Sequence, residues 1–201
     1  MNRLRTGFSM AALAGLFLAA GFLIGGPKGA AAVALIAFAV WNADKVLLSM
    51  AGARAANDPR LIHLVQRLSA RAGLPAPKLY IAENHRPNAF ATGRDPAHAA
   101  ICVTTGLLAR LSGEDELAGV LAHELGHIRH RDTLPMTLAR LALPAPLARS
   151  VGGRTCEREA DRASAEISGN PLWLASALER VGTHPSTEER VARLRAMEAA
   201  G

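Results

Sequence analysis

Hydrophobic residues form an almost unbroken block at the start of the chain. Residues 8–26 contain no charged side chain, and a helix of this length is long enough to span a bilayer. A second apolar stretch, residues 29–50, has Asp44 and Lys45 as its only charged residues. Because only two residues separate the two stretches, we expect a two-helix transmembrane hairpin within residues 1–52.

The alternative for the first apolar stretch is a cleaved signal peptide, because Arg3 and Arg5 precede it. The stretch is long for a signal sequence and a second one follows, which favours the hairpin. Basic residues flank the hairpin on both sides, with Arg54 and Arg60 after it, whereas Lys28 alone lies between the two spans. Positive charge favours the cytoplasmic face. We therefore expect a multi-pass protein of the inner membrane whose main domain is cytoplasmic.

The rest of the chain, residues 53–201, has the spacing of hydrophobic residues that is typical of helices, with a few short strands. The expected helices lie at residues 59–72, 155–168 and 172–181, with a short helix or turn at 106–111. Capping boxes begin two more helices at Ser112 and Ser186. The expected strands lie at residues 78–82, 89–92 and 99–104. Residues 134–147 are apolar but contain three prolines, which indicates a loop or a short surface helix. The pattern predicts a mainly α fold with a small β-meander.

Composition excludes some classes of function. The chain has 201 residues, of which half are hydrophobic, and this suits one compact domain with an additional segment. Its net charge of +6 is not concentrated in a basic block, so we expect no nucleic-acid surface and some attraction to anionic lipid instead. The two cysteines, Cys102 and Cys156, are expected to be reduced in a cytosolic domain.

Residues 123–127 read H-E-L-G-H and lie within the helix predicted after Ser112. His123 and His127 are one helical turn apart on the same face, so both imidazoles can bind a single metal ion. Glu124 is rotated by about 100° from His123 and can act as a base for a metal-bound water. The alternative is a pair of surface histidines that bind no metal.

A catalytic zinc site needs a third protein ligand. Residues 157–161 read E-R-E-A-D, which places Glu157 and Asp161 on one face of a helix while Glu159 points away. One of the two carboxylates can bind the metal, and the other can orient a ligand histidine. Cys156 is an alternative soft ligand. A solvated charged helix face remains the alternative to any metal role.

These residues resemble the motifs of the HtpX family of membrane-bound zinc metalloproteases, which are relatives of the CAAX prenyl endopeptidases. The matching motifs are H-E-L-G-H, E-x-x-A-D at residues 157–161, N-A-F-A-T-G at residues 88–93 and H-P-S-T-E-E-R at residues 184–190. They follow the family's order and, together with the hairpin, extend over nearly the whole chain. Family members usually carry two more hydrophobic segments between the H-E-L-G-H motif and the E-x-x-A-D motif. This chain therefore resembles a shortened member.

The resemblance implies a zincin-like metallopeptidase domain in residues 53–201 with one zinc ion per chain. It implies His123, His127 and Glu157 as the zinc ligands and Glu124 as the general base that activates water.

The resemblance also implies roles for residues around this centre. Asp161 is expected to orient a ligand histidine, and His184 and Arg190 to stabilise the substrate carbonyl or the oxyanion. The alternative for His184 and Arg190 is structural, as part of a helix start and as an ion pair. An extended substrate is expected to bind along a predicted strand by strand addition. The residues of this strand are Asn88, Ala89, Phe90, Ala91 and Thr92.

The expected function is that of a membrane-anchored zinc metalloendopeptidase that hydrolyses unfolded or misfolded membrane and cytosolic proteins. Its expected partners are polypeptide substrates and the lipid bilayer, with no nucleic acid. One alternative is a catalytically silent, zinc-stabilised membrane adaptor that binds extended segments, but the intact Glu124 argues against it. Another is a processor of lipid-modified proteins, for which the small membrane portion leaves little room.

Overall fold

The chain divides into two units, of which the first is Met1–Asn42 and the second is Ala43–Gly201. The computed structural model describes residues 3–144, 147–148, 151, 153–182 and 187–199.

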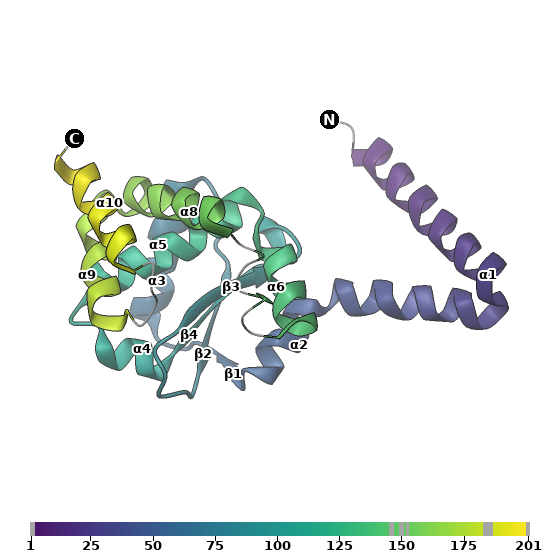
Figure 1. Cartoon of the computed structure of the whole chain (residues 1–201), viewed down its shortest axis with the longest axis horizontal. Helices are drawn as coiled ribbons and strands as arrows, with labels where there is room; N and C mark the ends of the chain where they lie inside the picture. Colours follow the sequence, from purple (N-terminus) through teal and green to yellow (C-terminus); the bar gives the residue numbers. More distant parts are fainter. Residues whose placement is uncertain (1–2, 145–146, 149–150, 152, 183–186, 200–201) are drawn as a thin grey trace. The chain divides into compact units, whose positions relative to one another are not determined.

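The first unit is a helical segment, α1 (Arg3–Trp41), that is broken at a Gly-Gly-Pro sequence (Figure 1). Gly25 and Gly26 have non-helical backbone angles, with φ of 58° at Gly26, and Pro27 follows them. Glycine adopts positive φ without strain, and proline lacks the N–H that would bond to the preceding turn. The helix is therefore interrupted where the sequence predicts the end of the first span.

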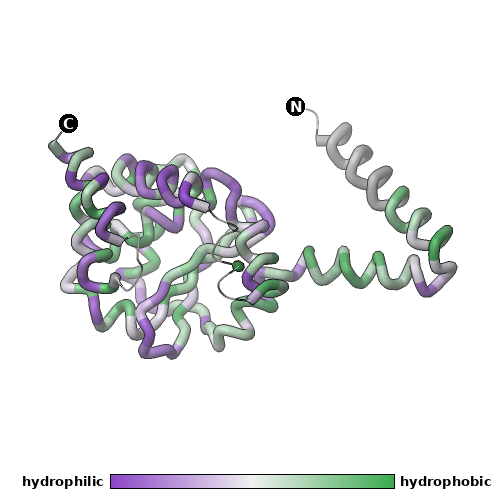
Figure 2. The backbone as a smooth tube through the Cα atoms, in the orientation of Figure 1, coloured by the Kyte–Doolittle hydropathy of each residue, from purple (hydrophilic) through white to green (hydrophobic). Residues whose placement is uncertain are grey.

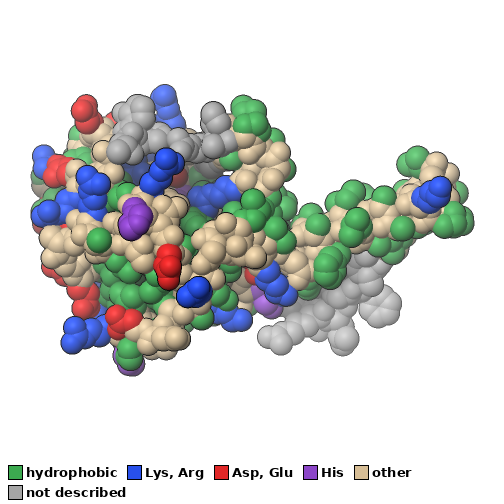
Figure 3. Space-filling view, turned by 90° about the horizontal axis from the view of Figure 1, so that it is seen from below, with side chains coloured by type: hydrophobic (Ala, Val, Ile, Leu, Met, Phe, Trp, Pro, Cys, Tyr) green, Lys and Arg blue, Asp and Glu red, His purple; other side chains and the backbone are tan. Residues whose placement is uncertain are grey.

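Among the described residues, one helical stretch, Gly15–Trp41, is long and apolar enough to cross a membrane. Most residues along this stretch are hydrophobic (Figure 2). Figure 3 shows hydrophobic side chains along the described part of α1, whereas charged side chains are scattered over the second unit. One candidate span does not establish the predicted two-helix hairpin, which stays a prediction.

The second unit is built around a four-stranded sheet in the order β1-β2-β4-β3. Strand β4 pairs in parallel with β2 and antiparallel with β3, and β1 pairs antiparallel with β2. The strands are β1 (Ala53–Ala55), β2 (Lys78–Ala82), β3 (Ala89–Gly93) and β4 (Ala99–Thr104).

The predicted β-meander is wrong, because β2 and β3 are not neighbours and their common partner is β4. All six residues of β4 are buried, and a strand that is apolar on both faces is stable in the middle of a sheet. Strand β1 was not predicted, because three residues with a central arginine carry no hydrophobic alternation.

Helices supply most of the second unit, and one short 3₁₀ helix, η1 (Pro96–His98), precedes β4. The α-helices are α2 (Ala43–Met50), α3 (Pro59–Ala72), α4 (Thr105–Arg110), α5 (Glu114–His130), α6 (Thr133–Ala142), α8 (Gly153–Ser168), α9 (Pro171–Val181) and α10 (Thr187–Ala199). These bounds agree with the predicted helices to within a few residues. For the apolar stretch at residues 134–147 the sequence predicted a loop or a short surface helix, and most of α6 lies within it.

The predicted capping box at Ser112 is wrong. Helix α5 begins at Glu114 with Gly113 as its N-cap, and no side chain caps it. The Glu116 carboxylate instead accepts a hydrogen bond from the Ser112 N–H at 2.7 Å, and it also accepts bonds from Ser176 and Arg180. The helix start is thus held by contacts with α9. The second predicted capping box begins at Ser186, which lies outside the described residues.

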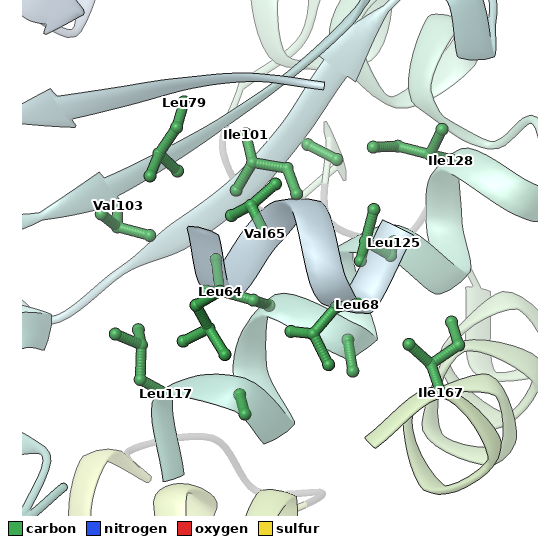
Figure 4. Close-up of a cluster of buried hydrophobic side chains, with 14 of the residues drawn as sticks. Leu64, Val65, Leu68, Leu79, Ile101, Val103, Leu117, Leu125, Ile128 and Ile167 are labelled. Atoms are coloured by element: carbon green, nitrogen blue, oxygen red, sulfur yellow. The ribbon is translucent and has the colours of Figure 1, made fainter. Parts of the chain in front are cut away.

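Two apolar clusters lie on opposite faces of the sheet. The larger one joins the sheet to α3, α5 and α8, and Figure 4 shows its labelled side chains converging around Val65 and Leu68 of α3. The smaller cluster contains Leu48 of α2, Phe90 of β3 and Cys102 of β4. The structure thus groups α2 with the second unit, and the predicted domain boundary at residue 52 stays a prediction.

Candidate metal centre

Helix α5 carries two histidines into the interior of the second unit. His123 and His127 lie one turn apart, and only 7% and 3% of their surfaces are exposed. Their ring centroids are 4.8 Å apart. The prediction that H-E-L-G-H lies in the middle of a helix is confirmed, and buried histidines are not the surface pair considered as the alternative.

Glu157 reaches both histidines from α8. Its carboxylate oxygens lie 3.5 Å from His123 Nε2 and 3.7 Å from His127 Nε2. One donor atom from each of the three residues lies within 4.8 Å of the other two. Tetrahedral zinc ligands at about 2.1 Å from the ion are about 3.4 Å apart, so the three donors can share one ion after small side-chain movements.

A second carboxylate lies behind each histidine. Asp161 Oδ1 is 3.2 Å from His123 Nδ1, and Asp132 Oδ2 is 3.2 Å from His127 Nδ1. Such a carboxylate keeps the proton on Nδ1 and leaves Nε2 free to bind a metal. This arrangement is characteristic of histidines that hold zinc, and it uses a donor set that zinc prefers.

Asp132 was missed in the sequence. Helix α5 ends at His130, and its C-cap Arg131 turns the chain back with a φ of 64°. The Asp132 N–H then donates to the His127 carbonyl at 3.0 Å. This turn brings the Asp132 carboxylate beside His127. The signal in the sequence was an acidic residue directly after the helix, which is too common to be diagnostic.

The carboxylates make this centre a favourable place for a cation. Burial by itself lowers the pKa of His123, but hydrogen bonds to Asp161 and Glu157 outweigh it and raise this pKa to about 9. For the carboxyl groups burial acts in the opposite direction and raises the pKa of Glu157 and Asp161. Contacts with His123 and Arg190 outweigh burial and hold both pKa values at about 2. A metal ion can take the place of the proton on His123 and satisfy the same negative charge.

Glu124 lies next to the histidines without belonging to the ligand cluster. Its carboxylate is buried, and its Oε2 atom accepts a hydrogen bond from the Ala91 N–H of β3 at 2.7 Å. This bond ties the side chain to the edge of the sheet and leaves Oε1 available to a water molecule. The role of Glu124 as the general base stays a prediction.

Strand β3 lies at one end of the described strand order, so the predicted substrate segment includes an edge strand. The backbone of Asn88 pairs with Thr104 on the β4 side. In an antiparallel ladder the direction of backbone groups alternates, so Phe90 and Thr92 also face β4 while Ala89 and Ala91 face the outer edge. Most residues of β3 are buried, and substrate binding along this strand stays a prediction.

Arg190 of α10 forms ion pairs with Glu157 and Asp161 of α8. Its Nη1 atom lies 3.1 Å from Glu157 Oε2, and Nη2 lies 2.5 Å from Asp161 Oδ1. Arg193 adds a weaker contact of 3.5 Å to Asp161. Arg190 thus forms the ion pair considered in the sequence analysis, and it does so directly beside the candidate metal ligands. His184 lies outside the described residues.

Two other features around the centre concern Cys156 and Arg140. Cys156 and Cys102 are both free thiols, and Cys156 is not part of the three-residue ligand cluster. Arg140 of α6 was missed in the sequence, although its guanidinium lies over the ring of Phe90 at 5.2 Å. A lone arginine in an apolar helix gave no sign of the strand against which it packs.

Comparison with known proteins places the chain in a peptidase family. The model of "Peptidase family M48" matches residues 55–152. A curated relative, "Protease HtpX homolog" from Acidiphilium cryptum (strain JF-5), is 40% identical over 280 aligned residues, covering 98% of this chain and 96% of the relative. The alignment is longer than this 201-residue chain, so the relative carries segments with no counterpart here. This supports the interpretation of a shortened member.

A solved structure has the same fold. The crystal structure of S. mikatae Ste24p matches with a TM-score of 0.59 and 16% sequence identity, over 95% of this chain. This chain spans 64% of the length of that structure. At this level of identity the match establishes the fold alone.

Proposed function

The chain belongs to peptidase family M48, among the HtpX protease homologues, and on that premise we propose that it is a membrane-anchored zinc metalloendopeptidase. The observation that carries the proposal is the convergence of His123, His127 and Glu157 within 4.8 Å, with the Glu124 carboxylate held beside them by β3. A purely structural metal site has no use for this additional buried carboxylate.

His123, His127 and Glu157 would hold the metal as two neutral imidazoles and one carboxylate. Zinc in such a site lowers the pKa of its bound water towards 7 and polarises the substrate carbonyl. Asp161 and Asp132 keep the two imidazoles in the tautomer that presents Nε2. The Arg190 guanidinium neutralises part of the surrounding carboxylate charge and fixes the orientation of Glu157.

Glu124 is assigned as the general base. The Ala91 N–H holds its Oε2 atom, so Oε1 is directed to the water that attacks the scissile carbonyl. Glu124 takes the proton of that water and then donates it to the leaving amine, so one residue serves both steps. His184 and Arg190 are proposed to stabilise the oxyanion, and Arg190 supports this role by its position beside His123 and Glu157.

The proposed substrates are extended segments of unfolded or misfolded proteins, which would bind along β3. The outward N–H and C=O groups of Ala89 give the strand a pairing edge next to Glu124. The apolar Gly15–Trp41 segment supports attachment to the inner membrane. The excess of basic residues outside the predicted hairpin supports a cytoplasmic location of the second unit.

The test compares the purified wild type with Glu124→Gln, Glu157→Ala and Glu159→Ala in detergent. Cleavage of unfolded casein and zinc content are measured for each protein. We expect about one zinc per chain and cleavage in wild type, zinc without cleavage in Glu124→Gln, and loss of both in Glu157→Ala. Glu159 is exposed on the same helix and serves as the matched control, which should behave as wild type.

Each assignment has an outcome that contradicts it. Equal cleavage by wild type and Glu124→Gln would exclude Glu124 as the base. A wild-type protein that binds no zinc would exclude the metal site. A zinc-loaded wild type that binds unfolded protein but cleaves nothing would favour the adaptor instead of the peptidase.

A further inference from the structure

Helix α6 places a positive charge against the edge strand near the candidate metal centre. The helix runs beside β3 (Figure 1), and a buried hydrogen bond of 2.8 Å joins Thr137 Oγ1 of α6 to Thr92 Oγ1 of β3. Arg140 lies three residues beyond Thr137, on the same face of the helix. Its guanidinium carbon is 5.2 Å from the centroid of the Phe90 ring.

Arg140 is close enough to the candidate metal centre to interact electrostatically with its carboxylates. Desolvation by the surrounding protein lowers the pKa of Arg140, and the negative charges of Glu124 and Glu157 act in the opposite direction. Phe90 directly precedes Ala91, whose N–H binds Glu124. The guanidinium therefore lies beside the strand with which a substrate would pair.

Unlike Arg190, Arg140 forms no hydrogen bond with any residue that the structure describes. Arg190 uses its guanidinium to bind Asp161 and Glu157. Over the described ranges of the chain, Arg140 forms no ion pair, and part of its side chain is exposed to solvent. Stacking on an aromatic ring fixes the plane of a guanidinium while its donors stay available for a carboxylate.

The position of Phe90 indicates which part of a substrate Arg140 meets. Ala91 belongs to the apolar cluster on the α5 face of the sheet, whereas Phe90 belongs to the cluster on the opposite face. Arg140 therefore lies across the strand from the helix that carries Glu124. Side chains of a peptide paired with β3 alternate between these two faces. A substrate side chain on the α6 face of the sheet would therefore lie next to Arg140. The scissile carbonyl would lie nearer the α5 face, which carries Glu124.

We propose that Arg140 binds a carboxylate of the peptide substrate and gives the site a preference for an acidic group near the scissile bond. This inference rests on the proposed function, in which the substrate is an extended polypeptide. A carboxylate can come from an internal Glu or Asp side chain or from the C-terminus of the peptide. Both sources share the same bidentate chemistry with a guanidinium.

The test measures binding, so it does not depend on cleavage. Fluorescent extended peptides that differ by a single Glu-to-Gln exchange are titrated with the detergent-solubilised full chain carrying Glu124→Gln. A second pair of peptides differs only in a free or an amidated C-terminus. We expect one of the two acidic forms to bind about 5- to 10-fold more tightly than its neutral partner, as one partly exposed charge-assisted contact would produce.

Adding Arg140→Gln should abolish this difference, and Arg140→Lys should retain part of it because the charge remains without the planar fork. Arg195→Gln is the control, since Arg195 is an exposed arginine on α10 that pairs with Glu179. An equal preference for acidic peptides with and without Arg140 overturns the inference. If the preference depends on Arg140 but wild type cleaves neither peptide, the peptidase proposal fails and the carboxylate site stands.

Discussion

Replacement of Gly126 by alanine tests whether the close approach of α5 and α8 sets the geometry of the metal centre. A Cβ atom at Gly126 would lie 3.0 Å from Ala160 Cα and 3.0 Å from Ala163 Cβ. Ordinary contacts begin at 3.4 Å, so the two helices must separate by a few tenths of an ångström. Ala160 is three residues from Glu157 on α8. If α8 moves away from α5, it would therefore carry the Glu157 carboxylate away from His123 and His127.

Two quantities should change in Gly126→Ala. Overpacking of this size lowers the free energy of unfolding by about 1–3 kcal/mol. Displacement of one of the three ligands should weaken zinc binding about tenfold, comparable to the loss of a residue that orients a ligand. Zinc affinity is measured on metal-stripped protein by competition with a chromophoric chelator. The free energy of unfolding is measured by denaturant titration of the metal-free protein.

The matched control is Gly119→Ala on the same helix. A Cβ atom there would lie 2.5 Å from the Leu174 backbone nitrogen and 2.7 Å from the Trp173 carbonyl carbon, both in α9, which carries no candidate ligand. We expect a larger loss of stability but wild-type zinc affinity of the folded protein. Gly113→Ala, where a Cβ meets open space, controls for the substitution itself. Wild-type zinc affinity in Gly126→Ala, or an equal loss in Gly126→Ala and Gly119→Ala, would refute the reasoning.

Two further predictions concern carboxylates that do not bind the metal. Asp132→Asn removes the charge behind His127 and should weaken zinc binding about 10- to 100-fold in the same competition assay; unchanged affinity contradicts this role. Burial alone raises the pKa of Glu116, but hydrogen bonds from Ser176 and Arg180 help to lower it from 4.5 to about 2. This carboxylate therefore stabilises the fold above pH 4.5, and up to about 3 kcal/mol is lost as the pH falls towards 2. The free energy of unfolding, measured by denaturant titration across this pH range, should fall less with pH in Glu116→Gln than in wild type. Identical pH profiles of the two proteins would contradict the prediction.

Some of the candidate metal centre could be predicted because it depends on one helix at a time. The spacing of His123 and His127 follows from 3.6 residues per turn, and so does that of Glu157 and Asp161. The helices that carry them have clear hydrophobic patterns, and the structure places them as expected. That the two pairs belong to one centre was implied by the family resemblance, and the distances between their side chains are consistent with it.

Other contacts could not be predicted because they join elements that are distant in the sequence. Asp132 reaches His127 through a left-handed turn at the end of α5, which a non-glycine residue rarely adopts. The Glu116 carboxylate lies in the first turn of α5, and nothing in the local sequence indicates that it bonds to Ser176 of α9. Arg140 packs on Phe90 only because α6 folds back along β3.

The sequence by itself determined where most helices of the second unit lie, which residues are candidates for metal binding, and that an apolar segment precedes them. Hydrophobic spacing and helix geometry are local, so they can be read along the chain. The tertiary structure alone decided that β4 is central, that the Ala91 N–H holds Glu124, and that Arg140 faces the edge strand. These features depend on which surfaces pack together, because burial of apolar faces selects the partners of each strand and helix.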